Sequence, residues 1–141
     1  MTSHSVRAYL SAVEAALTPL RDNERAEAMA AYMKNHFPFL GIPTPARRKA
    51  TRGLARPELA TVHAIARALW KHNEREYHYV AVDLLATTAE ALEPLATLAL
   101  IEELALKHSW WDSVDGLASV GSTVLRHHPD ARDVVWAWSA H

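Results

Sequence analysis

The sequence of 141 residues contains no cysteine, only four glycines, and no apolar run long enough to cross a bilayer. The absence of cysteine excludes a disulfide framework, a thiolate nucleophile and a cysteine-based metal site, and it suits a reducing cytoplasm. The first residues, which include Arg7 and Glu14, lack the apolar segment of a secretory signal. With 50 % hydrophobic and 22 % charged residues, we expect one globular cytoplasmic domain over residues 1–141, with no membrane partner.

The net charge of -1 hides an uneven distribution of basic residues. The stretch "TPARRKATRGLAR", residues 44–56, holds five basic residues and no acidic one, whereas the rest of the chain holds 10 basic and 16 acidic residues. The five are Arg47, Arg48, Lys49, Arg52 and Arg56. The sequence therefore predicts one basic patch on an acidic protein.

Apolar residues recur at spacings of three and four, and no segment alternates in the way a half-buried strand does, so we predict an all-α protein. Capping residues favour helix starts at Asn23, Thr44, Asn73 and Ser109. Helices joined by short turns pack as antiparallel pairs, which favours an α-solenoid; a closed bundle is the alternative, because no strict repeat motif is legible. About eight helices are expected, near residues 6–17, 24–36, 44–56, 57–72, 74–89, 93–107, 109–127 and 129–141.

The segment "HSWWDSVDG", residues 108–116, starts the seventh predicted helix. One stripe of this helix is expected to face the core, and a neighbouring stripe combines an indole, a carboxylate and small hydroxyls. The expected core stripe is Trp110, Val114, Leu117, Gly121, Val124 and Leu125, and the neighbouring stripe is Trp111, Asp115, Ser119 and Ser122. Asp112 lies in the first turn, where a carboxylate complements the helix dipole, and we assign it a structural role.

Two interpretations of Trp111 and Asp115 follow from this spacing. In the first, Trp111 packs at the edge of a helix interface, and Asp115 is solvated or caps a neighbouring helix. In the second, the π face of the indole and the carboxylate together form a binding face for a cation. Periodicity alone favours the structural interpretation, since most helical tryptophans are structural.

Three segments resemble the AlkD-type DNA alkylation repair glycosylase family: "YMKNHFPFLGIPTPARR" (residues 32–48), "ALWKHNEREYHYVAVDLL" (68–85) and "KHSWWDSVD" (107–115). The resemblance implies a solenoid of HEAT-like helical pairs whose concave basic face holds duplex DNA. It also implies a metal-free and cofactor-free glycosylase of base excision repair. This activity excises positively charged N3- and N7-alkylated purines, such as 3-methyladenine and 7-methylguanine, without flipping the base into a pocket.

Carried over by position, the resemblance assigns Trp111 as the active-site tryptophan, Asp115 as the catalytic aspartate and Tyr32 as an aromatic residue of the DNA-facing cleft. The basic third helix acquires a matching role, in which Arg47, Arg48 and Arg52 contact phosphates; the alternative for each arginine is a solvated face. The nine histidines form no "HExxH" motif, and we predict no metal site.

Members of the family continue through further helical pairs, which supply a second active-site tryptophan and an arginine at the DNA backbone. We therefore expect residues 1–141 to correspond to the N-terminal part of a longer architecture. Trp136 and Trp138 in the last predicted helix are expected in the core or on an apolar edge that favours self-association. Two alternatives to catalysis stay open: a DNA-binding module and a protein-interaction scaffold, which differ in the salt dependence of their binding.

Overall fold

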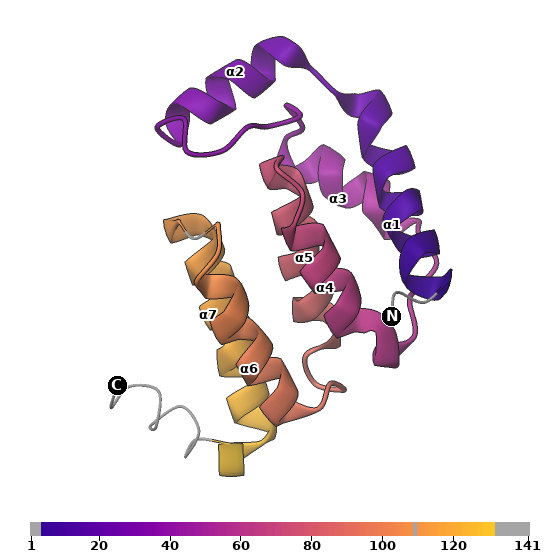
Figure 1. The fold of residues 1–141 in the computed structure, drawn as a ribbon, viewed down its shortest axis with the longest axis vertical. Helices are drawn as coiled ribbons and strands as arrows, with labels where there is room; N and C mark the ends of the chain where they lie inside the picture. Colours follow the sequence, from indigo (N-terminus) through magenta and orange to yellow (C-terminus); the bar gives the residue numbers. More distant parts are fainter. Residues whose placement is uncertain (1–3, 109, 132–141) are drawn as a thin grey trace. The chain divides into compact units, whose positions relative to one another are not determined.

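The computed structural model describes residues 4–108 and 110–131, and all regular structure in these ranges is helical (Figure 1). The predicted all-α class is confirmed, and short turns join several consecutive helices, as in an α-solenoid. The α-helices are α1 (His4–Leu17), α2 (Asn23–Tyr32), α3 (Thr44–Arg52), α4 (Val62–Trp70), α5 (Arg75–Thr88), α6 (Pro94–Ala105) and α7 (Trp111–His127). Three single-turn 3-10 helices, η1 (Thr18–Leu20), η2 (Leu59–Thr61) and η3 (Pro129–Ala131), lie between or after them.

Several helix ends differ from the predicted ones by a few residues. The cap of α2 is Asp22 rather than Asn23, because the Asp22 carboxylate accepts a hydrogen bond from the backbone N–H of Arg25 at 3.0 Å. Thr44 is the first residue of α3 instead of its cap. Of the eighth predicted helix, only Pro129–Ala131 is described, as a 3-10 turn; Trp136, Trp138 and the predicted cap Ser109 lie outside the described residues.

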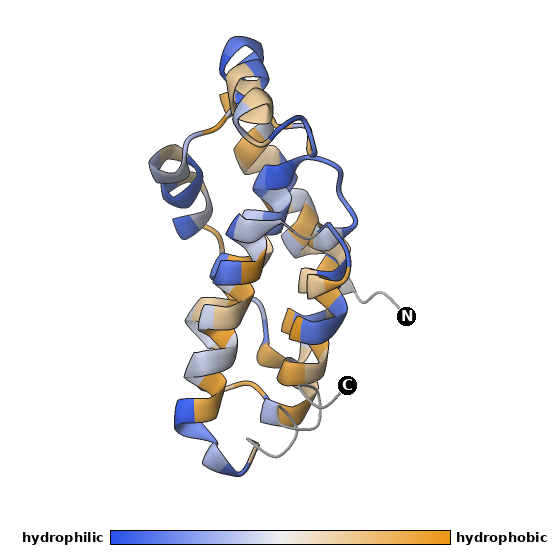
Figure 2. Cartoon of the chain, turned by 90° about the vertical axis from the view of Figure 1, so that its left-hand side faces the viewer, coloured by the Kyte–Doolittle hydropathy of each residue, from blue (hydrophilic) through white to orange (hydrophobic). Residues whose placement is uncertain are grey.

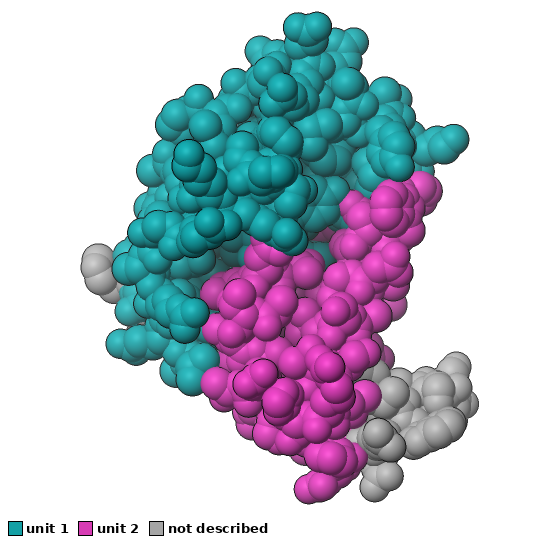
Figure 3. Space-filling model, turned by 180° about the vertical axis from the view of Figure 1, so that it is seen from behind, with its two compact units in different colours: residues 1–81 teal, residues 82–141 magenta. Residues whose placement is uncertain are grey.

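The chain divides into two compact units, residues 1–81 and residues 82–141 (Figure 3). In the first unit, α1 packs against α3 and α4. The apolar residues of α4 lie on its inward side, with Val62, Ile65 and Leu69 fully buried. Figure 2 shows hydrophobic and hydrophilic residues alternating along the ribbons, which is the pattern of amphipathic helices.

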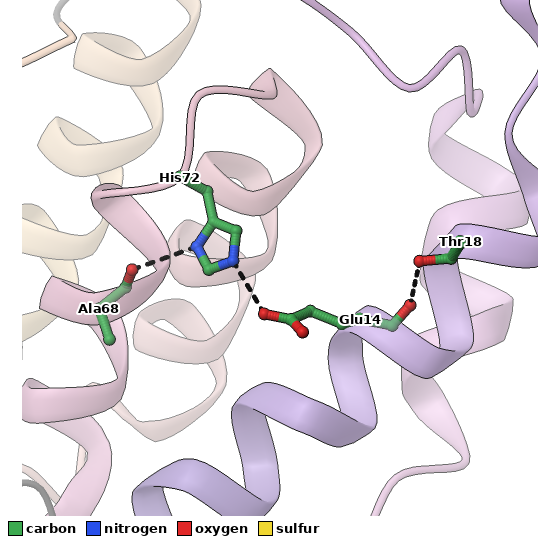
Figure 4. A network of polar contacts seen from close by, with 4 residues as sticks. All are labelled: Glu14, Thr18, Ala68 and His72. Carbon is green, nitrogen blue, oxygen red and sulfur yellow. Dashed lines mark hydrogen bonds and ion pairs between the residues drawn. The ribbon is translucent and has the colours of Figure 1, made fainter.

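A polar contact joins α1 to the end of α4 in the first unit (Figure 4). Nε2 of His72 lies 3.1 Å from the carboxylate of Glu14, and Nδ1 lies 3.3 Å from the carbonyl oxygen of Ala68. The same imidazole stacks on the ring of Tyr77, with 4.1 Å between the ring centroids. Burial raises the pKa of the Tyr77 phenol, and the nearby carboxylates of Glu14 and Glu74 raise it further.

In the second unit, α6 and α7 form a packed hairpin. The carboxylate of Glu93 caps α6 by accepting hydrogen bonds from two backbone N–H groups of its first turn, at 3.1 and 2.6 Å. The helix α7 also approaches the last two turns of α5 closely: a Cβ atom on Gly116 would lie 2.8 Å from Cγ1 of Val82. Glycine at position 116 thus permits this packing distance, and it fixes which side of α7 faces outward.

Candidate functional site

Trp111 and Asp115 lie one turn apart on the exposed side of α7. Trp111 is the first residue of the helix and is 55 % exposed, and Asp115 is also exposed. Among the described residues, the Asp115 carboxylate makes no hydrogen bond or ion pair. Residues at this i, i+4 spacing are neighbours on a helix surface, so a ligand on this side of α7 meets the indole and the free carboxylate together.

The other polar side chains at the start of α7 hold the helix terminus. Asp112 accepts a hydrogen bond from the backbone N–H of Ser113 at 2.8 Å, which agrees with its predicted structural role. The hydroxyl of Ser113 accepts from the backbone N–H of Trp110 and donates to its carbonyl oxygen, at 3.3 and 3.2 Å. Two aspartates three residues apart therefore have different environments: Asp112 has a backbone partner and Asp115 does not.

The predicted core stripe of α7 is partly wrong. Val114 is 41 % exposed, whereas Ser113, one position earlier, is buried. The observed inward stripe is Ser113, Leu117, Val120 and Val124. The close approach of Gly116 to Val82 accounts for the rotation, because it turns the side of the helix next to Gly116 toward α5. The outward position of Trp111, Asp115, Ser119 and Ser122 follows from the same rotation.

Tyr32 is the last residue of α2 and is 76 % exposed. The chain turns sharply after it, with Lys34 and Asn35 in the left-handed region at φ 57° and 58°. The backbone N–H groups of this turn bond back to carbonyl oxygens of α2, as in a helix C-cap. Tyr32 belongs to the first compact unit, and Trp111 and Asp115 belong to the second.

The arginines of α3 have two different environments. Arg48 and Arg52 are exposed one turn apart and form a cationic surface with Lys49. Arg47, which we predicted as a third phosphate contact, is only 3 % exposed. Its guanidinium lies over the ring of Tyr79, 5.0 Å from the centroid, and Nη1 donates to the hydroxyl of Thr44 at 3.5 Å. Arg47 is therefore an interior cation, and the predicted interface is reduced to Arg48 and Arg52.

The basic helix predicted over residues 44–56 is shorter in the structure. The helix α3 ends at Arg52, with Gly53 as its C-cap. Arg56 is exposed but lies beyond the helix, so it does not continue the i, i+4 row of Arg48 and Arg52.

A buried carboxylate fixes the loop that joins α2 to α3. The side chain of Glu76, on α5, accepts hydrogen bonds from the backbone N–H groups of Leu40, Gly41 and Ile42 at 2.8, 3.0 and 3.2 Å. Three consecutive amides on one carboxylate satisfy donors that the loop's own backbone does not pair. Sequence reasoning missed Glu76, because an acidic residue in a mostly polar stretch gives no sign of burial.

The residue before Glu76 strengthens the same attachment. The backbone N–H of Arg75 donates to the carbonyl oxygen of Pro38 at 2.9 Å. Its buried guanidinium lies 3.8 Å from the centroid of Phe37 and within 3.1 Å of Nδ1 of His78. Arg75 and Glu76 thus anchor the loop that starts just beyond Tyr32 and ends at the basic helix α3.

The described residues contain no group of three or more metal-ligating side chains, and no helix among them is long and apolar enough to cross a membrane. The described residues thus define an all-helical protein that carries an exposed Trp–Asp pair on α7. The family model for DNA alkylation repair enzymes matches residues 13–141, and the chain belongs to this family.

The chain is also similar to a solved structure described as "Predicted DNA alkylation repair enzyme from Enterococcus faecalis". The two are 29 % identical with a TM-score of 0.70, and the match covers 83 % of this chain and 56 % of the other. The chain therefore spans a little over half the length of that structure. A search of curated proteins found no match.

Proposed function

We propose that this chain is a DNA glycosylase that removes positively charged N3- and N7-alkylated purines from duplex DNA. The observation that carries the proposal is the pair formed by an exposed indole and a free carboxylate, Trp111 and Asp115, on α7. Membership of the DNA alkylation repair enzyme family and the cationic surface of Arg48 and Arg52 support DNA as the substrate.

The chemistry requires little beyond these groups. An alkylated purine already carries a positive charge, so it leaves without protonation by the enzyme. When the bond between C1′ and N9 breaks, its electron pair neutralises the purine, and the sugar becomes oxocarbenium-like. The Asp115 carboxylate stabilises that positive charge and orients the attacking water. Water adds its oxygen to C1′ and loses a proton, which leaves free base and an abasic site.

In this proposal, Trp111 contacts the cationic nucleotide through its π face, and Tyr32 contributes a second aromatic surface. Both side chains are largely exposed, which suits contact with a nucleotide that stays in the duplex instead of entering a pocket. Arg48 and Arg52 contact phosphates without reading sequence. The structural interpretation of Trp111, with its indole packed at a helix interface, agrees less well with a 55 % exposed side chain.

The direct test is release of free 7-methylguanine from methylated duplex DNA by the full chain and by Asp115→Asn. We expect the variant to bind the duplex as tightly as the parent and to lose about 100-fold or more of its excision rate, because only the transition-state charge is left unmatched. Asp130→Asn is the matched control, since it removes one exposed carboxylate just beyond the C-terminal end of α7 and should leave the rate unchanged.

Equal rates for Asp115→Asn and the parent would contradict the catalytic assignment. Absence of release by the parent, together with salt-sensitive duplex binding, would favour a DNA-binding module, which is the second candidate because the chain spans 56 % of the matched structure. Binding of a peptide with an affinity that is insensitive to salt would favour a protein-interaction scaffold.

A further inference from the structure

The two compact units differ strongly in charge. Residues 1–81 hold 12 Lys and Arg against 7 Asp and Glu, whereas residues 82–141 hold three Lys and Arg against nine Asp and Glu. The second unit carries the Trp111–Asp115 pair, so the proposed site lies on an acidic part of the chain. DNA is a polyanion and is repelled by an acidic surface. Binding to such a surface therefore requires basic side chains near the points of contact.

Within the described residues of the second unit, 82–108 and 110–131, the basic side chains are Lys107, which precedes α7, and Arg126, which lies in the last turn of α7. Arg126 follows Asp115 by eleven residues, which is about three turns and about 20° in an α-helix. The exposed side chain of Arg126 therefore lies on the same side of α7 as Asp115, about 16 Å away along the helix axis. A single helix fixes this distance, so it depends on no other part of the fold.

Short side chains separate these two residues on that side of the helix. They are Ala118, Ser119 and Ser122, all exposed. Between Asp115 and Arg126, the described residues on this side of α7 therefore present only short side chains to a nucleic-acid backbone.

The Arg126 guanidinium is held in place by its own helix. Nη2 donates to the hydroxyl of Thr123 at 3.2 Å, and that hydroxyl donates to the carbonyl oxygen of Ser119 at 3.2 Å. A guanidinium has five donors, and one partner orients it while leaving others for a ligand. A planar, oriented guanidinium is suited to phosphate oxygens.

We propose that Arg126 binds a backbone phosphate of the DNA about 16 Å from the sugar that reacts at Asp115. This inference rests on the proposed glycosylase function and adds a phosphate-binding residue to it. The duplex advances about 3.4 Å per base pair along its axis, so a phosphate at this distance lies within about five nucleotides of the lesion. Among the described residues of the acidic second unit, Arg126 thereby supplies the cation on this side of α7.

A double-mutant cycle tests the contact directly. Binding is measured for Asp115→Asn, whose expected slow excision keeps the lesion intact, and for Asp115→Asn/Arg126→Ala, on duplexes that carry one 7-methylguanine. Uncharged methylphosphonates then replace single phosphates in turn on each side of the lesion. We expect Arg126→Ala to weaken binding about 3- to 10-fold and to lower the salt slope by about one. We also expect one methylphosphonate position, within about five nucleotides of the lesion, to weaken binding by Asp115→Asn but not by the double variant.

Three results would overturn the inference. Arg126 has the alternative role of a cation at a helix C-terminus, which stabilises α7 alone. In that case Arg126→Ala lowers the stability of the protein, leaves the salt slope unchanged and shows no coupling to any phosphate. If Asp115→Asn does not bind the duplex and the parent chain releases no base, the proposed function fails and this inference fails with it. A parent chain that excises and an Arg126→Ala variant with an unchanged salt slope would contradict the inference alone.

Discussion

The carboxylate of Glu76 accepts a hydrogen bond from the backbone N–H of Gly41 at 3.0 Å, across 35 residues of sequence. The same glycine has a φ of 95°, and a Cβ atom there would lie 2.0 Å from the backbone oxygen of Asp22. Position 41 is therefore restricted twice, by a left-handed backbone and by the start of α2. The contact links α2, the loop after it and α5 within the first unit.

This contact predicts a large effect of Glu76→Gln on stability. The amide oxygen still accepts a hydrogen bond, but the new NH2 group faces backbone donors in a fully buried position. We expect the free energy of unfolding to fall by about 2–3 kcal/mol, measured by urea denaturation. Faster amide hydrogen exchange at Leu40 and Ile42 should accompany the loss. A loss below about 0.5 kcal/mol would mean that the buried carboxylate does not hold the loop.

Two glycines of α7 provide a matched pair of substitutions. Gly121→Ala places a methyl group 3.8 Å from Cδ1 of Ile101, an ordinary contact, so the better helix propensity of alanine should stabilise the protein by about 0.5–1 kcal/mol. Gly116→Ala places it 2.8 Å from Cγ1 of Val82 and should destabilise the protein by about 1–3 kcal/mol. Thermal unfolding measures both. Stabilisation by both variants would contradict the close packing of α7 on α5.

Alkaline pH should destabilise the protein through Tyr77. Its pKa in the folded chain is raised by burial and by Glu14 and Glu74, whereas the unfolded chain ionises near the ordinary value of about 10. The folded state thus keeps a proton that the unfolded state loses. The stabilisation is complete below about pH 10 and is lost as the pH rises through the folded pKa. Tyr77→Phe should give a smaller loss of stability between pH 9 and pH 11, while urea unfolding at pH 7 serves as the reference.

Replacement of two adjacent arginines of α3 should affect different properties, protein stability in one case and DNA binding in the other. Arg47→Ala takes away a buried cation over Tyr79 and should lower the free energy of unfolding by about 2 kcal/mol. Arg48→Ala removes an exposed side chain, so stability should change by less than about 0.5 kcal/mol, while the salt slope of duplex binding should fall by about one. A reduced slope for Arg47→Ala with unchanged stability would reverse the assignment.

The presence of the helices was predictable, but their ends were less so. Apolar spacing and proline positions located the helices at the sequence level, because both act over a few neighbouring residues. Asp22 and Asn23 are both good caps, and local sequence does not decide between them. The selection of Asp22 as the cap depends on Leu40, whose carbonyl oxygen accepts a hydrogen bond from the Asp22 backbone N–H at 3.0 Å.

Some features of the candidate site were also predictable from the sequence, and others were not. The spacing of Trp111 and Asp115 on one helix side was predictable, since four residues make about one turn. The burial of Arg47 was not, because it depends on Tyr79, which lies 32 residues further along the chain. The inward turn of Ser113 likewise depends on the contact between Gly116 and Val82. Interactions between distant segments decided each of these points.

Positions 41 and 115 would respond differently in a library of variants under selection. Selection for folding alone should return glycine at 41, since any Cβ there meets the backbone of α2. Selection for folding should leave position 115 nearly random, because its exposed carboxylate has no partner among the described residues. Recovery of aspartate at position 115 only when cells must survive DNA methylation would show that this residue is required for repair. Recovery of glycine at position 41 under selection for folding would show that this residue is required for the fold.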